Sequence, residues 1–197
     1  FLLPPSEGKN TWWLEGADSL SFSFNKPYDI AMNATEKDLK CSWKRYEEGI
    51  ELNKQNSNKL KAILPSIERY SWVMYNAIDY ENMSDSGKQV FEDKCLILSG
   101  MYWLLKSFDE IGNYKLPIET KGLYDFWWDQ IIDTINGLHP DYVINFLPIS
   151  YSKLIYGKNK TIEMDFCPYL IIPKLITSCG VRCLQCPRGR SFLVSPA

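Results

Sequence analysis

The sequence predicts a single compact domain of the α+β class, with a mixed sheet flanked by helices. Two observations predict it. Short apolar segments typical of buried strands interleave with longer segments of helical periodicity, and no repeat or low-complexity linker divides them. The 197 residues suffice for one sizeable core, and 45% are apolar and 23% charged, which is ordinary for a soluble globular protein. We expect this domain to cover residues 1–166.

The strands are predicted from apolar segments bounded by turn residues. FLLPPS forms a short first strand that Pro4 and Pro5 end. KCLILSGMYWLL, at 94–105, is the clearest buried strand, with a turn at Ser99 and Gly100. SLSFSF at 19–24 alternates polar and apolar residues and is either a half-buried strand or an extended loop. DYVINFLP at 141–148 and TIEMDF at 161–166 are the remaining candidates.

The helices are predicted from about Ile30 onward. A helical pattern covers IAMNATEKDLK and RYEEGIELNKQ and continues with SNKLKAILPSIERY, broken at Pro65. YSWVMYNAI is either strand or helix. LYDFWWDQIIDTINGL is an amphipathic helix near whose end Gly137 lies. Its inward side chains are predicted to be Leu123, Phe126, Trp127, Ile131 and Ile135.

The formal net charge of −2 gives the molecule no strong field to attract nucleic acid, so any such contact must come from a local basic patch. The start, FLLPPSEGKN, has no basic segment and too short an apolar run for a signal peptide. The longest apolar stretch is too short and interrupted to span a bilayer. We therefore expect a cytoplasmic protein without membrane contact.

Residues 167–197 differ in composition from the rest. They hold four of the six cysteines and four basic residues but no acidic one, which leaves the first 166 residues at −6. Cys179, Cys183 and Cys186 are spaced C-x3-C-x2-C, as in the loop that holds a [4Fe–4S] cluster in radical S-adenosylmethionine enzymes. That loop belongs to a much longer barrel. We expect no cofactor and no metal site, with an iron–sulfur cluster on these three thiols as the alternative.

Recognised catalytic motifs are absent. His139 is the only histidine and follows a helix, where a capping or surface role is expected; a metal site of several histidines is impossible. What remains is a set of clusters that place Lys9, Arg45, Arg69 or Lys106 beside tyrosine or tryptophan. Such groups could hold phosphate while the rings stack on bases. Cations packed on exposed aromatic rings are the ordinary structural alternative.

The clusters, in their order and spacing, resemble the YaaA family of peroxide stress proteins, also called DUF328 or UPF0246. The resemblance covers about residues 2–165. It rests on LLPPSEGK, ATEKDL…KRYEEGIELN, LPSIERYSWVMYNAIDY, LILSGMYWLLKSFDEIGNYKLPI, LYDFWWDQI and VINFLPISY. The family implies a cytoplasmic mixed α/β domain that limits damage when peroxide meets free iron. It also implies sequence-independent DNA binding through a helix-hairpin-helix element and a basic cleft, with no reaction securely attached.

The resemblance also implies where DNA would bind. The hairpin candidate is DLKCSWKRYEE, and a helix N-terminus assisted by lysine would hold a phosphate there. We expect a monomer that contacts DNA phosphates. The expected DNA or anion contacts are Ser6, Lys9, Lys40, Lys44, Arg45 and Arg69; the expected cleft-lining residues are Glu7, Tyr70, Tyr75, Lys106, Asp109, Tyr114, Asn145 and Tyr151.

Four tryptophans depart from the family pattern. Trp43, Trp72, Trp103 and Trp128 stand where the patterns GKGKR, RYxGxxY, LYGLLRP and FWGD have glycine. A coding sequence in which UGA specifies glycine would account for all four, and ordinary UGG codons there would end the hypothesis. A second departure is the segment after residue 166, which lacks the family's basic ending; a frameshift or fused fragment would explain it. Pro148 replaces a small polar residue in the family's N-x5-Y pattern of Asn145 and Tyr151.

Two other functions stay open. The chain could be an enzyme on a small phosphorylated or nucleotide ligand, with SEGK and Arg69 as the anion clamp and Glu7, Glu68 or Asp109 as acid or base. It could also be an iron sensor through its terminal cysteines. The sequence leaves any catalytic residue unknown.

Overall fold

The computed structural model describes residues 1–12, 20–40, 43–57, 63–140 and 143–155, and a small mixed sheet lies at its centre. In that sheet β1 (Leu2–Leu3) pairs in parallel with β3 (Leu96–Ser99), and β3 pairs antiparallel with β4 (Trp103–Leu105). The register places Leu2 beside Leu96 and Ile97 beside Leu105. The mixed sheet predicted from the sequence is confirmed.

A tight turn joins β3 to β4, so the predicted strand at 94–105 is a hairpin that turns after Ser99. Gly100 begins the turn, and a Cβ atom there would lie 2.7 Å from the backbone oxygen of Leu116. Only a residue without a side chain permits this approach. The hairpin is thereby fixed against the segment that precedes α7.

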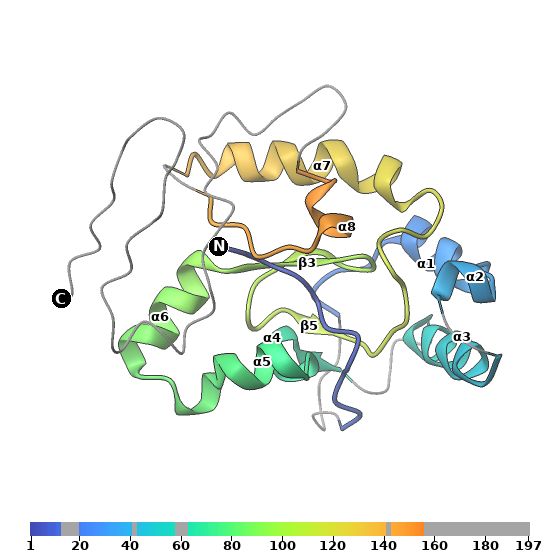
Figure 1. The fold of residues 1–197 in the computed structure, drawn as a ribbon, viewed down its shortest axis with the longest axis horizontal. Coiled ribbons are helices and arrows are strands. Elements are labelled where there is room, and N and C mark those ends of the chain that lie inside the picture. Colours follow the sequence, from blue (N-terminus) through green and yellow to red (C-terminus); the bar gives the residue numbers. More distant parts are fainter. Residues whose placement is uncertain (13–19, 41–42, 58–62, 141–142, 156–197) are drawn as a thin grey trace.

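Helices make up most of the remaining described structure and surround the sheet (Figure 1). A second sheet of two strands, β2 (Leu64–Pro65) and β5 (Glu110–Ile111), lies between helices. The mixed α and β class is confirmed. The helices are α1 (Asn25–Met32), α2 (Glu36–Leu39), α3 (Trp43–Ser57), α4 (Ser66–Arg69), α5 (Val73–Ile78), the 3-10 helix η1 (Tyr80–Asn82), α6 (Asp85–Lys94), α7 (Leu123–Gly137) and α8 (Ile149–Ser152).

Local sequence explains two of these helices well. Thr35 and Asp38 form a capping box that starts α2, each accepting a hydrogen bond from the other's backbone N–H. In α7 the predicted inward residues Leu123, Trp127, Ile131 and Ile135 are all buried, and Phe126 is half-buried beside them. The amphipathic prediction for this helix is confirmed.

Two predictions of local structure are corrected. Leu64 is expected in a helix that breaks at Pro65, but it forms strand β2 with Pro65, because Pro65 lacks an N–H and suits a short two-stranded edge. Of the two alternatives for 19–24, residues 20–24 adopt the loop. Within 143–148 the backbone makes one isolated bridge, Leu2 to Asn145, so this segment lines β1 without forming a strand of its own. The ambiguous YSWVMYNAI segment contains helix α5.

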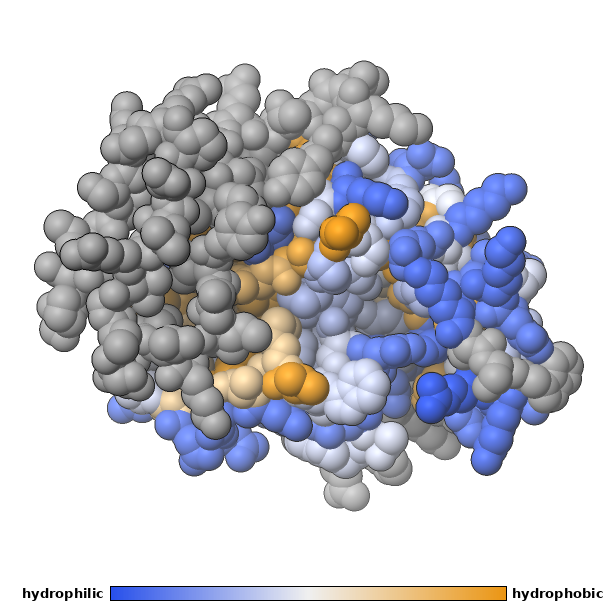
Figure 2. Space-filling model, in the orientation of Figure 1, coloured by the Kyte–Doolittle hydropathy of each residue, from blue (hydrophilic) through white to orange (hydrophobic). Residues whose placement is uncertain are grey.

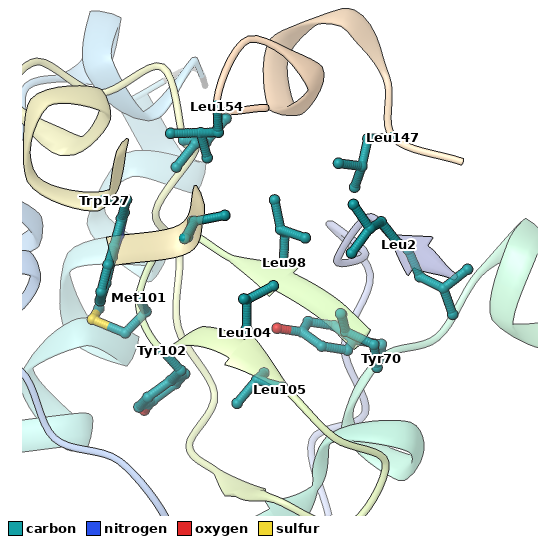
Figure 3. Packing of buried hydrophobic residues seen from close by; sticks show 14 of the residues in the cluster. Leu2, Tyr70, Leu98, Met101, Tyr102, Leu104, Leu105, Trp127, Leu147 and Leu154 are labelled. Atoms are coloured by element: carbon teal, nitrogen blue, oxygen red, sulfur yellow. The ribbon is translucent and has the colours of Figure 1, made fainter. Parts of the chain in front are cut away.

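The core gathers on the β3–β4 hairpin. Figure 3 shows Leu98, Leu104 and Leu105 of the hairpin, with Trp127 of α7 and Tyr70 on either side of them. The indole N–H of Trp127 donates to the carbonyl of Gly100 at 2.8 Å, which joins α7 to the hairpin turn. Leu147 and Leu154 close the core above β1 and β3.

Two of the four unexpected tryptophans hold backbone conformations that favour glycine. Trp72 has φ 90° and ψ −173°, and Trp103 has φ 76°. For a bulky residue such values are outliers, and the first lies in a region that essentially glycine alone adopts. Trp43 and Trp128 lie in helices α3 and α7, where no such demand exists. The backbone therefore agrees with a glycine pattern at Trp72 and Trp103.

Some predictions fall outside the described residues. These are the strand at 161–166 and everything predicted for residues 167–197, including the boundary after 166. Cys41 and Cys95 are far in sequence from the other cysteines, which predicts buried free thiols at both. Cys41 also lies outside the described residues, and Cys95 is a buried free thiol. The connection from α2 to α3 contains residues 41–42, so the helix-hairpin-helix element stays a prediction.

Candidate functional site

The SEGK loop, residues 6–9, is held by backbone pairing to the segment that follows α4. Lys9 and Tyr70 form an isolated antiparallel β-bridge through their backbones. On either side of it, the Asn10 N–H donates to the Arg69 carbonyl at 2.9 Å and the Ser71 N–H donates to the Gly8 carbonyl at 3.0 Å. Residues about 60 positions apart in the chain are therefore fixed side by side. This pairing decides where the loop's side chains point.

The side chain of Lys9 turns inward. Its amine donates to the Ser6 carbonyl at 2.9 Å and lies 4.4 Å from the centre of the Tyr114 ring and 5.6 Å from that of Tyr70. Removal from water lowers the pKa of Lys9 to about 7, assisted by the charges of Lys115 and Arg69 and opposed by Glu7. Near neutral pH this amine is present in both protonation states.

Three hydroxyl groups form a chain beneath Lys9. The Tyr114 hydroxyl lies 2.9 Å from that of Tyr70 and 2.8 Å from that of Ser99. Ser99 Oγ accepts N–H bonds from Met101 and Tyr102, so its own proton points to Tyr114. Burial raises the pKa of Tyr114 to about 12 and raises that of Tyr70 well above its ordinary value, so both phenols are neutral and can donate protons.

Glu7 stands at the outer end of the loop among three cations. It forms an ion pair with Lys115, and this hydrogen bond, with the charges of Lys115, Lys9 and Arg45, lowers the pKa of Glu7. The Glu7 side chain is 60% exposed and that of Lys115 is 17% exposed, so the pair lies at the surface end of the site. Three cations thus face one carboxylate.

Helix α3 is joined to this cluster through a buried amide. The Asn53 side chain donates to the Lys115 carbonyl at 3.0 Å and accepts from the Lys115 N–H at 2.8 Å. Asn53 is fully buried, so this pair of bonds fixes the backbone at Lys115. Sequence reasoning missed Lys115 and Ser99. The one sequence feature that pointed toward Lys115 was Asn53, a polar residue on the helix face that Tyr46 and Ile50 share.

Arg69 is placed differently from its predicted role. The residue is fully buried, and its Nη1 donates to the carbonyls of Asn10 and Trp12, the second at 3.3 Å. Burial lowers the pKa of Arg69 to about 10, which leaves the guanidinium charged at neutral pH. A buried guanidinium that holds backbone carbonyls fixes the N-terminal loop. The prediction that Arg69 contacts phosphate directly is therefore not supported by its position.

The remaining predicted residues fall into separate groups. Lys44 and Arg45 are exposed on α3, and Lys40, at the C-terminal end of α2, pairs with Glu119. Figure 2 shows that hydrophilic side chains gather on the side formed by α1, α2 and α3.

Other expected cleft residues support structure. The Tyr75 hydroxyl donates to the Pro4 carbonyl at 2.8 Å, and Asp109 accepts from the Lys106 N–H in a turn. The Asn145 side chain accepts from the Leu147 N–H, and its amide lies 3.3 Å from the Ser152 hydroxyl. Tyr151 is half-buried against the core. The structure thus brings Ser6, Glu7, Lys9, Tyr70 and Tyr114 together, with Arg45 facing Glu7. It leaves Lys106 and Asp109 in a turn elsewhere and Asn145 beside β1.

Neither a metal centre nor a bilayer span is found in the described part of the chain. No group of three histidine, cysteine or acidic side chains there is arranged to hold a metal ion. Cys179, Cys183 and Cys186 lie outside the described residues. Within those same limits, none of the helices is both long and apolar enough to cross a bilayer. His139 is exposed after α7, as expected for a surface residue.

Comparison with known proteins gives the family. The model of the family described as peroxide stress protein YaaA matches residues 1–169. The chain belongs to this family. Relatives of the YaaA family named UPF0246 protein are 31% identical over 119 residues in Finegoldia magna and 33% identical over 119 residues in Fusobacterium nucleatum. These matches cover 59% and 57% of this chain and 47% and 48% of the relatives.

A UPF0246 relative from Marinomonas is 28% identical over 150 residues, covering 69% of this chain and 56% of that protein. The chain thus spans about half the length of the curated relatives it matches.

Proposed function

We propose that this YaaA family member acts in the cytoplasm as a monomeric peroxide stress protein that binds duplex DNA without reading its sequence. By covering the DNA backbone it would limit oxidation driven by iron. The observation that carries this proposal is the gathering of Lys9, Lys115 and Arg45 around the single carboxylate of Glu7, beside the exposed Lys44. An excess of cations at one place suits a phosphate backbone, although the whole chain is slightly acidic.

Arg45 and Lys44 are the exposed members of the group and supply the first contacts in this proposal. Lys115 follows once a phosphate displaces Glu7 from it. Lys9 lies deeper, and an entering anion would raise its pKa and favour the charged form. Arg69 keeps the loop in place from within and does not touch DNA.

Fluorescence anisotropy with a labelled duplex, measured over a series of salt concentrations, tests the proposal. Binding to phosphates releases counterions, so the logarithm of the affinity should fall linearly with the logarithm of the salt concentration, by about 0.9 per phosphate contacted. The double variant Lys44→Glu, Arg45→Glu should bind at least about tenfold more weakly and show a slope reduced by about two contacts.

The matched control is Lys88→Glu with Lys94→Glu, which makes the same charge change on α6. Its affinity should stay within about twofold of the wild type if a local patch binds DNA. Equal losses in both double variants would show that net charge alone governs binding. Absence of binding by the wild type at low salt would refute the proposal.

A second candidate function is an enzyme acting on a small phosphorylated or nucleotide ligand. The Lys9 amine favours this candidate, because it points inward onto the rings of Tyr70 and Tyr114 and has a pKa of about 7. Lys115 takes the place of Arg69 as the anion contact. Thermal-shift screening of nucleotides and phosphosugars tests this, because a ligand at 100 times its dissociation constant adds about 2.7 kcal/mol to the free energy of unfolding. No shift with any of them would remove this candidate.

A further inference from the structure

Lys9 has a setting that DNA phosphate binding alone does not require. A lysine that serves only as a phosphate contact works best as an exposed, fully charged group. Here the amine is turned from the surface onto the rings of Tyr114 and Tyr70, with a backbone carbonyl as its hydrogen-bond acceptor. Glu7 is the carboxylate whose charge acts on Lys9, and it forms its ion pair with Lys115. Among the residues that the structure describes, these contacts hold the amine out of water and no carboxylate is bound to it.

We propose that the Lys9 amine is a nucleophile that forms an imine with an aldehyde carrying a neighbouring phosphate. Two sources share this chemistry: a small phosphorylated aldehyde and the sugar aldehyde of an abasic site in DNA. The DNA source rests on the proposed function; the small-molecule source does not.

The neighbouring charges supply the phosphate preference. Lys115 is ion-paired with Glu7, and the charge of the exposed Arg45 also acts on that carboxylate, while the Lys9 amine is turned onto the Tyr114 ring. A phosphate replacing Glu7 at Lys115 would place an attached aldehyde toward Lys9. The phosphate is then held by Lys115 and Arg45, which leaves the Lys9 amine for the carbonyl carbon.

The reaction balances without any further reagent. The neutral Lys9 amine attacks the carbonyl carbon, a C–N bond forms, and the carbonyl oxygen becomes a hydroxyl as the nitrogen loses a proton. The C–O bond then breaks and the oxygen leaves as water, taking a second proton that comes from the nitrogen. The neutral phenols of Tyr70 and Tyr114 can carry these protons between nitrogen and oxygen. Products are an imine and one water molecule.

The burial of Lys9 supplies the reactive form of the amine. With a pKa of about 7, about half of the Lys9 amines are neutral at pH 7. For an ordinary lysine, with a pKa near 10.4, about one in 2,500 is neutral at that pH. Imine formation needs the free amine, so Lys9 should react ahead of the surface lysines.

Reductive trapping with pyridoxal 5′-phosphate tests the proposal on the full chain. The protein is incubated with this probe from about pH 6 to about pH 10 and reduced with borohydride, and the modified lysines are located by peptide mass spectrometry. Lys9 should be labelled at least about tenfold faster than Lys88 and Lys94 at pH 7, with a midpoint near pH 7. Pyridoxal lacks the phosphate and closes partly into an internal hemiacetal, so its rates are compared relative to Lys88 and Lys94; on that scale it should label Lys9 several-fold more slowly than the phosphorylated probe does.

Lys9→Arg keeps the charge but removes the nucleophile, so labelling at this position should disappear and the remaining lysines should react as before. Should this variant fail to fold, the pH midpoint at Lys9 in the wild type still decides the matter. Labelling of Lys9 no faster than that of Lys88 and Lys94, or with a midpoint above about pH 9, would overturn the proposal. Equal rates with pyridoxal would overturn its phosphate part.

A second arm separates the two sources. A duplex with one abasic site is incubated with the protein and borohydride, and a covalent complex is sought on a denaturing gel. A duplex with a tetrahydrofuran site, which has no aldehyde, is the control. A cross-link at Lys9 assigns DNA as a source; labelling by the small probe alone assigns a small phosphorylated aldehyde. If pyridoxal 5′-phosphate labels Lys9 but the wild-type protein does not bind DNA at low salt, the proposed function is refuted and this inference stands.

Discussion

Trp72 shows how a single residue can contradict its backbone. Its φ of 90° and ψ of −173° belong to glycine, yet the side chain is 61% exposed and contributes little burial in return. A Cβ added to the neighbouring Gly8 would lie 3.1 Å from the Trp72 ring, so the indole also crowds the SEGK loop. The residue is a source of strain beside the candidate site.

Trp72→Gly is therefore expected to stabilise the protein by about 1–2 kcal/mol, because the strained conformation costs glycine nothing. The measurement is the free energy of unfolding from urea titration. Trp128→Gly is the contrast: it lies inside helix α7, where glycine costs about 1 kcal/mol and packing is lost as well. If Trp72→Gly lowers the free energy of unfolding instead, the packing of the indole stabilises the protein by more than the strained backbone costs.

Lys9 is the second residue whose environment makes a measurable difference. Its folded pKa of about 7 lies below the unfolded value, so between about pH 7 and pH 10.4 the unfolded chain binds more protons at this residue than the folded one. The free energy of unfolding then rises with pH across this window. Below pH 7 both states are protonated and the dependence stops.

Lys9→Met should remove this pH dependence and raise stability most at pH 7 and below, because no ammonium group must be held out of water. Urea midpoints of both proteins, measured from about pH 6 to about pH 9, check it. A rise that is equally steep in Lys9→Met would mean that Lys9 is solvated and charged throughout. Such a result would also weaken the case for a reactive amine.

At the scale of elements, the β3–β4 hairpin is the part on which the site depends. It supplies Ser99 to the hydroxyl chain, and its turn at Gly100 receives both the Leu116 carbonyl from one side and the Trp127 indole from the other. The segment from Leu116 back to Tyr114 carries the ring under Lys9. A displaced turn would therefore move the site as well as weaken the core.

Gly100→Ala is expected to cost about 2–3 kcal/mol of stability, since its Cβ would meet a backbone oxygen at 2.7 Å that cannot move alone. Gly137→Ala is the matched control: a Cβ there meets nothing within 4 Å, and alanine favours the end of α7 by up to about 1 kcal/mol. Thermal unfolding of the two variants gives the comparison. Similar melting temperatures for both would mean that the turn adapts.

Tyrosines contribute several of the buried side chains of the whole molecule, within a core that is mainly aliphatic. Burial raises the pKa of Tyr70, Tyr75, Tyr114 and Tyr151, and their hydroxyls find partners inside the fold or at its edge. In the unfolded chain the same phenols ionise near pH 10. Above that pH the folded state binds more protons than the unfolded one, so stability falls as the pH rises.

We expect an alkaline unfolding transition that is steep, because several phenols lose protons together on unfolding. The change in urea midpoint from about pH 9 to about pH 11, with tyrosinate absorbance recorded in parallel, measures it. In Tyr114→Phe one of these protons is removed, so the loss of stability with pH should be shallower. Tyrosinate absorbance that appears before unfolding would show that water reaches these phenols in the folded state.

Elements whose local preferences agree with their burial could be predicted well. Helix α7, the apolar segment at 94–105 with its turn, and the first strand follow from periodicity and turn residues. Pro65 and the segment at 143–148 were harder. The first depends on pairing with Glu110 and the second on a single bridge to β1, and neither partner is local.

The candidate site divides in the same way. Ser6, Glu7, Lys9, Tyr70 and Tyr114 could be named from clusters of cations and aromatic rings, and family resemblance pointed to their common cleft. Lys115 could not be found, because nothing in its sequence neighbourhood shows that Asn53 holds its backbone or that Glu7 faces its amine. Arg69 was assigned to phosphate because an arginine shows no sign of burial in sequence.

By itself the sequence determined the family and the mixed class of the fold, and it named part of the candidate site, Ser6, Glu7, Lys9, Tyr70 and Tyr114. These depend on composition, spacing and local periodicity, which the chain carries wherever it folds. Only the tertiary structure decided that the Lys9 amine faces inward and that the Arg69 guanidinium fixes the N-terminal loop. The physical reason is that burial and charge pairing arise between distant segments, and the same side chain is a cation in water or a titrating amine in the interior.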